Sequence, residues 1–377
     1  MLSMVKSIAE INEKIRRGDA VVVRADEVPD IVGEKGVKKA AHEIDVVTTA
    51  TFGAMCSSGA FLNFGHTDPP IKMQKIWLNE VEAYAGLAAV DAYLGATELS
   101  LDKGIEYGGA HVIEDLVRGR EVKVRATAYG TDCYPRKLLK ANITIDDLNQ
   151  ATLYNPRNCY QRYNAATNSS KNTIYTYMGA LLPQNRNVNF SGTGELSPLN
   201  NDPNYRTIGF GTKIFLGGAQ GYVAGSGTQH SPKEGFGNLA VTCDLKEADP
   251  KYLAGASITG YGTSLLVGIG VPIPVLDEEV VKSCAVRNRD IEVGVFDYSI
   301  PKRDRPAIRK VNYEELFSGS IEVNGVKAKT ACLSSIRKTN EILEILEGWI
   351  VEDKFQLTTP AYTCLLYTSD AAEKRIV

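Results

Sequence analysis

Two cysteines stand in sequence contexts that suit thiol chemistry. Cys56 lies in residues 53–59, GAMCSSG, where small side chains let backbone N–H groups approach a sulfur anion. Only the thiolate form of cysteine is strongly nucleophilic, and the hydroxyls of Ser57 and Ser58 are further donors to it. The segment fits two interpretations equally: a reactive thiol, or a buried cysteine in a tight turn.

Cys133 lies in residues 129–137, YGTDCYPRK. Arg136 and Lys137 place positive charge near this thiol, which favours the thiolate. Either side chain also suits a substrate carboxylate. The alternative is a turn with solvated basic residues, and the residues alone leave both interpretations open.

Four histidines are scattered through the chain, and none forms a metal-binding pair, so we expect no metal site. His66 follows Cys56 by ten residues and is a candidate acid or base beside the thiol, or else a structural loop residue. His230 ends the segment 225–230, GSGTQH, which we expect to form a polar wall of a site. The glycines before it lack nucleotide-binding spacing and are explained by tight turns.

The composition bounds the class of protein. The chain has 377 residues, 44% of them hydrophobic, and a formal net charge of −3, which argues against a protein that coats nucleic acid or a membrane surface. Seven cysteines without a C-x-x-C pair indicate free thiols in a reducing cytoplasm. The charged N-terminal segment predicts a helix rather than a signal peptide. Glycines and prolines interrupt the most apolar stretch, residues 264–276, so we expect no transmembrane helix there.

The hydrophobic pattern predicts alternating strands and helices, and therefore an α/β or mixed α+β fold in one large domain. The expected helices cover residues 8–17, 35–43, 75–96 and 341–349. The expected strands cover residues 20–23, 44–49, 122–129, 239–243 and 264–268. Two of these strands lead into Cys56 and Cys133, so loops at strand ends would carry the site. Residues 153–206 show no period, and we expect irregular structure that covers or lines the site. The basic stretch 301–310 is either a solvated loop or a surface that steers an acidic protein.

Four segments together resemble a known family. They are residues 48–60 (TTATFGAMCSSGA), 63–66 (NFGH), 129–135 and 215–230. They are similar to the homocysteine-biosynthesis family of methanogens and other anaerobes, the L-aspartate semialdehyde sulfurtransferases. The resemblance spans residues 5–360 and implies an enzyme that converts aspartate semialdehyde, sulfide and reducing equivalents to homocysteine.

The resemblance also implies partners and roles. A ferredoxin-type iron–sulfur protein would supply electrons, and no tightly bound cofactor or nucleic acid is expected, while a homo-oligomer is left open. The two cysteines that matter in the family match Cys56 and Cys133. We hypothesise that Cys56 carries the sulfur as a persulfide and that Cys133 resolves it as a disulfide, which requires the two thiols to face each other across a polar pocket. The expected substrate-binding residues are Ser57, Ser58, His66, Arg136, Lys137 and His230.

The end of the chain departs from the family pattern. We expect residues 1–360 to form the sulfurtransferase domain. Many relatives continue into paired regulatory CBS modules, which we expect to be absent here. Residues 364–373 resemble translated sequencing-adapter read-through, so residues 361–377 would be an artefact, or else a disordered authentic tail.

Two other classes of function stay open on the residues alone. One is a thiol redox or sulfur-carrier protein that hands sulfur on without forming homocysteine. The other is an acyl- or CoA-transfer enzyme, a class that often uses a glutamate nucleophile, although no glutamate in this sequence stands out for that role.

Overall fold

A central mixed sheet forms the body of the protein. The computed structural model describes residues 6–231 and 236–364. The strand order in this ten-stranded sheet is β1-β2-β21-β17-β18-β19-β11-β3-β6, and β20 also pairs with β21. In the same order, the bounds are Val22–Arg24, Val46–Ala54, Gly262–Pro274, Lys213–Leu216, Ala219–Ser226, Leu239–Asp244, Gln150–Asn158, Gly59–Asn63 and Asp91–Gly95, with β20 at Leu253–Ile258.

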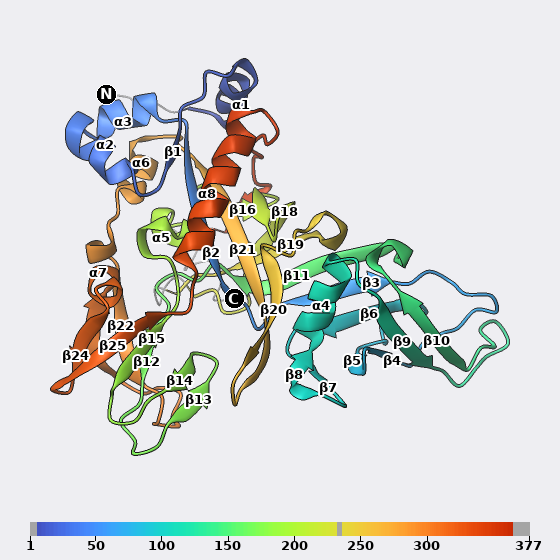
Figure 1. The fold of residues 1–377 in the computed structure, drawn as a ribbon. Helices are drawn as coiled ribbons and strands as arrows, with labels where there is room; N and C mark the ends of the chain where they lie inside the picture. The colour runs from blue at the N-terminus through green and yellow to red at the C-terminus, as the bar shows by residue number, and fades with distance from the viewer. Residues whose placement is uncertain (1–5, 232–235, 365–377) are drawn as a thin grey trace, which may run out of the picture.

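Two further sheets flank this body (Figure 1). One projects to the right of the view and has the order β10-β9-β4-β5-β7-β8, with bounds Leu138–Ile143, Val122–Thr127, Lys75–Leu78, Val81–Ala83, Leu99–Ser100 and Gly104–Gly108. The other has the order β23-β22-β12-β15-β25-β24, with bounds Ala307–Asn312, Glu292–Asp297, Ala165–Thr167, Asn187–Phe190, Val326–Cys332 and Ser320–Val323. Two short ribbons pair β13 with β14 and β16 with β26, at Ile174–Thr176, Gly179–Leu181, Gly209–Phe210 and Tyr362–Thr363.

Helices cover the sheets at several places. They are α1 (Ile8–Arg17), α2 (Val28–Lys35), α3 (Val37–Glu43), α4 (Gly109–Val117), α5 (Pro198–Asn201), α6 (Glu278–Cys284), α7 (Tyr313–Phe317) and α8 (Ile336–Val351). This mixture of helices and strands confirms the predicted mixed α/β class. No helix in the described ranges is both long and apolar enough to span a membrane.

The longest strand pairing in the ten-stranded sheet joins β2 and β21. These strands run antiparallel along their whole shared length, from Val46 opposite Pro274 to Ala54 opposite Leu266. Eight of the nine residues of β2 are buried, as its β-branched sequence predicts for a central strand. Helix α8 lies across this pair (Figure 1). An added Cβ on Gly268 would lie only 2.6 Å from Ile342 Cδ1, so this glycine permits the close helix–sheet contact.

Most of the predicted elements are present. Helix α1 matches its predicted bounds and ends at Gly18, whose φ of 73° is left-handed. Strands β9, β19 and β21 and helix α8 confirm the predictions for those regions, each with somewhat different ends.

The predicted helix over residues 75–96 is wrong, because this segment forms β4, β5 and β6. A two-residue turn with positive φ at Asn79 (49°) and Glu80 (60°) connects β4 to β5 and sets Leu78 opposite Val81. Such turns twist in the sense that a hairpin needs. Burial then alternates along β4 and β5, which is a strand pattern that the approximate helical spacing concealed.

The first residues of the expected tail pack against the body. Strand β26 pairs with β16, and Cys364 is buried while its N–H donates to Ile208 O at 3.1 Å. The rest of the predicted tail, residues 365–377, lies outside the described residues.

Candidate active site

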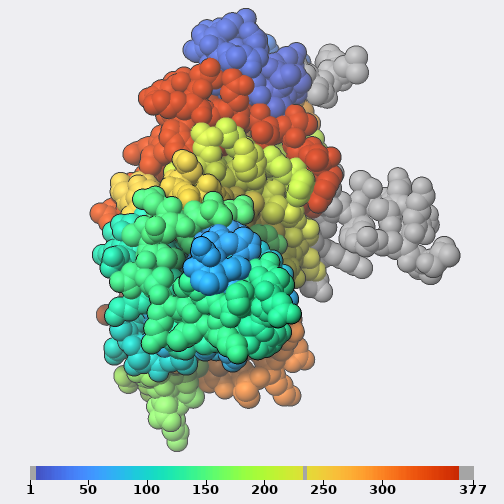
Figure 2. Space-filling model, turned by 90° about the vertical axis from the view of Figure 1, so that its right-hand side faces the viewer, coloured from blue at the N-terminus to red at the C-terminus, as the bar shows by residue number. Residues whose placement is uncertain are grey.

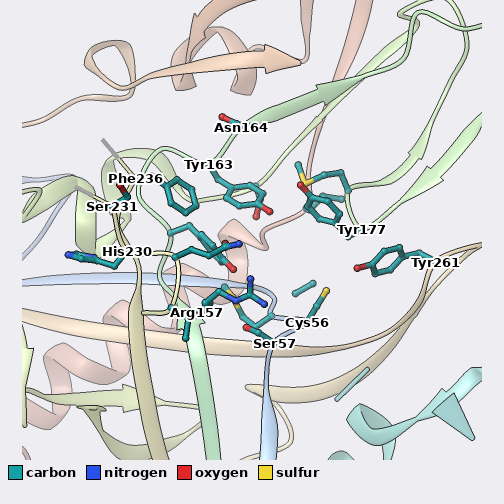
Figure 3. A pocket seen from close by; sticks show the side chains of 18 of the residues that line it. Cys56, Ser57, Arg157, Tyr163, Asn164, Tyr177, His230, Ser231, Phe236 and Tyr261 are labelled. Atoms are coloured by element: carbon teal, nitrogen blue, oxygen red, sulfur yellow. The ribbon is translucent and has the colours of Figure 1, made fainter. Parts of the chain in front are cut away.

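A cavity of about 770 Å³ opens where the end of β2 meets the irregular middle of the chain (Figure 3). Its walls come from the turn after β2, the end of β11, residues 160–178, the turn at 228–231 and the loop at Tyr261. Several residues of the segment 153–206 line this cavity, but the predicted irregular structure is wrong, because the segment holds the end of β11, strands β12 to β15 and helix α5. Cys56 and Ser57 form part of the wall, and Figure 3 shows the Cys56 sulfur facing Tyr261 and Tyr177.

The Cys56 turn is held from behind by a buried hydrogen-bond network. Met55 O accepts from the Ser58 N–H at 3.1 Å and from the Ser58 hydroxyl at 2.8 Å, so Ser58 closes the turn instead of lining the cavity. Asn155 Nδ2 donates to Ser58 Oγ at 2.8 Å, and Asn155 Oδ1 accepts from Ser57 Oγ at 3.4 Å. Because Asn155 is fully buried, these bonds fix the turn relative to β11.

A β-bulge places Arg157 beside this turn. The pairing of β11 with β19 slips between Asn155, opposite Val241, and Asn158, opposite Leu239. The Arg157 N–H donates back to Asn155 Oδ1 at 3.0 Å. In Figure 3 the guanidinium of Arg157 extends toward the side of the cavity that holds Cys56 and Ser57. Bulges often redirect a side chain at functional sites, and this one does so for Arg157.

Tyrosines form much of the remaining wall. The ring of Tyr163 lies 4.7 Å from Tyr160 and 6.4 Å from Tyr177, between ring centroids, and Tyr177 lies 6.1 Å from Tyr261. Burial raises the pKa of Tyr160 to about 12 and also raises the pKa of Tyr163 and Tyr261. These phenols therefore keep their protons at neutral pH and can donate hydrogen bonds to an oxygen anion.

His230 belongs to the polar wall that the sequence predicts. The turn carrying it is tied to the bulge, because the Thr228 N–H donates to Pro156 O at 3.0 Å. The imidazole packs edge-on to Tyr205 with ring centroids 4.6 Å apart, and burial lowers the pKa of His230. The ring is therefore neutral at neutral pH.

The described residues that line the cavity carry a net positive charge. Arg157 and Arg303 both line it, and none of the lining residues in the described part of the chain is Asp or Glu. A half-buried guanidinium such as that of Arg157, with no carboxylate among the described lining residues, favours an anionic ligand. The same lining offers no glutamate nucleophile for acyl or CoA transfer.

The second cysteine occupies a different region. Cys133 is exposed on the loop between β9 and β10, with its sulfur 3.5 Å from Thr131 Oγ1. Figure 1 shows this loop at the outer end of the projecting sheet, away from the end of β2. The prediction that Cys133 faces Cys56 across one pocket is wrong for this arrangement of the chain, because β9 and β10 carry the loop outward.

Three other predicted site residues accompany Cys133 and lie outside the cavity. Arg136 Nη2 donates to Asp68 O at 2.7 Å, and the His66 and Tyr134 rings are 6.0 Å apart. The Lys137 stem packs over Gly130. Figure 2 shows the loop before β4, in blue, seated among the green residues of the β9–β10 hairpin. We call this group of residues, His66, Cys133, Arg136 and Lys137, the hairpin cluster.

Sequence reasoning missed Arg157, Asn155 and the tyrosines. The signal was the string NPRNCYQRYN at residues 155–164, which places two arginines and two tyrosines at and just beyond the end of an alternating strand. Its link to Cys56 depends on the pairing of β11 with β3, which sets Tyr154 opposite Gly59 across a long sequence separation.

Comparisons with known proteins identify the family of this chain. A family model described as "Homocysteine biosynthesis enzyme, sulfur-incorporation" matches residues 20–357. A Methanosarcina acetivorans protein named L-aspartate semialdehyde sulfurtransferase is 58% identical over 355 residues, which cover 94% of this chain and 71% of that protein. A Methanocaldococcus jannaschii protein of the same name is 56% identical over 370 residues, covering 94% of this chain and 72% of that protein.

A Methanothermobacter thermautotrophicus protein without an assigned function is 34% identical over 327 residues, covering 84% of this chain and 73% of that protein. No solved structure matches the chain. The family match covers most of the chain, including the Cys56 turn, the β11 bulge and the tyrosine wall. This protein therefore belongs to the family of homocysteine biosynthesis enzymes that incorporate sulfur.

Proposed function

We propose that this chain inserts sulfide-derived sulfur into L-aspartate semialdehyde, with reduction, to form L-homocysteine, and that Cys56 carries the sulfur. The observation that supports this most is the setting of Cys56: a thiol on the wall of a cavity that holds an arginine and protonated tyrosines but no carboxylate among its described lining residues. Such a cavity suits a small aldehyde that carries a carboxylate.

The net reaction needs an outside reductant. An aldehyde and hydrogen sulfide add to give a thiohemiacetal, which loses water to give a thioaldehyde. Two electrons and two protons then reduce the C=S bond to a thiol, so one aldehyde, one hydrogen sulfide, two electrons and two protons give one thiol and one water. We propose that a ferredoxin-type iron–sulfur protein supplies these electrons and that the chain needs no tightly bound cofactor.

The tyrosine hydroxyls suit the addition step. When a sulfur nucleophile attacks the aldehyde carbon, negative charge develops on the aldehyde oxygen. Tyr160 and Tyr261 line the same cavity as Cys56, and their raised pKa values keep them protonated. A hydrogen bond from either phenol would stabilise the developing oxyanion.

Cys133 has a proposed role as the resolving thiol. Sulfide attacks a Cys56–Cys133 disulfide to give a Cys56 persulfide and a free Cys133, and the outer persulfide sulfur then adds to the aldehyde. Attack by Cys133 on Cys56 releases the thiohemiacetal and restores the disulfide. This cycle requires Cα atoms within about 7 Å. It therefore requires the hairpin cluster to move to the cavity, from the same chain or from a second copy.

The direct test uses purified protein with sulfide, aspartate semialdehyde and a low-potential reductant. Homocysteine is measured by mass spectrometry. We expect product with the unaltered protein and with Cys284→Ala, a control whose thiol is buried at the end of α6. We expect none with Cys56→Ser, and full activity of that variant would overturn the proposal.

The exposed position of Cys133 also favours a second candidate, a sulfur carrier that exchanges sulfur with another protein. The same assay separates the two functions. A persulfide on the protein without homocysteine formation would support the carrier.

A further inference from the structure

We propose that Arg157 binds the carboxylate of the aldehyde substrate and so selects an amino-acid aldehyde over a neutral one. This inference rests on the proposed function and adds a residue role to it. Sequence reasoning placed carboxylate binding at Arg136 or Lys137, but both belong to the hairpin cluster outside the cavity.

The backbone around Arg157 is fixed. The bulge in β11 directs the side chain, and the Arg157 N–H donates to the buried Asn155 at 3.0 Å. The carbonyl of the preceding residue, Pro156, accepts from the Thr228 N–H at 3.0 Å, which connects the bulge to the opposite wall. Because Asn155 also bonds Ser58, one buried side chain sets both the Cys56 turn and Arg157. A carboxylate held by Arg157 would therefore lie at a defined distance from the sulfur.

The guanidinium has unused bonding capacity. Arg157 Nε is buried and has no hydrogen-bond partner among the described residues. Leaving a buried N–H of a cation unsatisfied is costly, and such a group is normally paired. A carboxylate in the cavity would accept two parallel bonds from the planar guanidinium fork. No lining residue in the described ranges offers an acidic side chain that could take this place.

The other cavity arginine differs in position. Arg303 is exposed on the loop after β22, and it also lines an adjoining cavity of about 340 Å³ with Arg305 and Tyr298. Arg157 in contrast borders Cys56 and Ser57. The exposed Arg303 is therefore suited to attracting anions from solvent, whereas Arg157 is placed to hold one during the reaction.

The test compares two aldehydes that differ only in the carboxylate: aspartate semialdehyde and 3-aminopropanal. We expect Arg157→Gln to lower kcat/KM for aspartate semialdehyde by about 10- to 100-fold, the range for a lost bond to a charged group. The same variant should change kcat/KM for 3-aminopropanal by less than about 3-fold, because no bond to a carboxylate exists to be lost. Arg157→Lys keeps the charge without the fork and should fall between the two.

The matched control is Arg162→Gln, an exposed arginine five residues further along, which does not line the cavity. It should leave both rates unchanged. An equal loss for both aldehydes with Arg157→Gln, or no loss for either, would overturn the inference. If the unaltered protein forms no homocysteine at all, the proposed function fails instead, so the two failures are distinguishable.

Discussion

The regions around Cys56 and Cys133 are similar in sequence pattern but differ in the structure. Both thiols follow a predicted strand and both have small or polar neighbours. Cys56 lies on a walled cavity with Arg157 and buried tyrosines, whereas Cys133 is exposed in the hairpin cluster. This difference shows that a cysteine at the end of a strand lies in a cavity only when segments distant in the sequence form the other walls of that cavity. Here those walls come from residues 157–178, the turn at 228–231 and the loop at Tyr261.

The largest effects on homocysteine formation are expected when each of the two sulfurs is removed in turn. Cys56→Ser should lower the rate of homocysteine formation by at least about 10³-fold, because the group that carries the sulfur is lost. Cys133→Ser should stop repeated turnover with sulfide. A preformed Cys56 persulfide should still give one transfer in this variant when the added reductant, in place of Cys133, cleaves the disulfide between Cys56 and the bound substrate. Single-turnover and steady-state assays distinguish these outcomes. An equal loss of homocysteine formation in both assays for both variants would contradict the different roles of the two cysteines.

Removing the support behind Cys56 should affect only its own region. Asn155→Ala removes the donor to Ser58 Oγ and the acceptor of the Arg157 N–H, and should lower the free energy of unfolding by about 1–3 kcal/mol. The rate of iodoacetamide labelling at Cys56 should change, whereas the rate at Cys133 should not. Denaturant unfolding and peptide mapping measure the two effects. A change at both cysteines would show that the regions are coupled within one chain.

The smallest expected effect is a pH dependence of stability from His230. Burial lowers its pKa, so the unfolded chain takes up a proton more readily than the folded chain. As the pH falls below the ordinary value of about 6.5, the free energy of unfolding should fall until the lower folded-state pKa is reached. His230→Gln should remove this part of the slope. Urea unfolding, measured from neutral pH down to below the folded-state pKa of His230, tests this slope. His66→Gln in the hairpin cluster serves as the comparison.

Local pattern was sufficient for the parts of the fold where one period dominates. Helix α1 has its cap at Ser7 and its end at Gly18, and β2 begins with the β-branched run 46–49, so the helix and the start of the strand could be predicted. The prediction for the segment 75–96 failed because the apolar residues of three short strands recur with approximately helical spacing. The turn itself, at Asn79 and Glu80, is set by backbone angles that these residue types only weakly indicate.

The site could be predicted only in part for a related reason. Cys56, Ser57 and His230 were found because they lie in two short motifs, residues 53–59 and 225–230. Arg157 reaches the cavity through a bulge, whose position depends on pairing between β11 and β19 and not on β11 alone. The distance between Cys56 and Cys133 depends on how far the projecting sheet carries its loop, and local sequence contains no information on that.

The central claim is that Cys56 carries the sulfur that enters the product. The most direct measurement loads the protein with isotopically labelled polysulfide, maps the labelled peptide by mass spectrometry, and then adds aspartate semialdehyde with excess reductant. We expect the label on the peptide that contains Cys56 and its subsequent appearance in homocysteine. Labelled homocysteine formed equally well by Cys56→Ser, or a label that stays on Cys56 while homocysteine forms without it, would contradict the account.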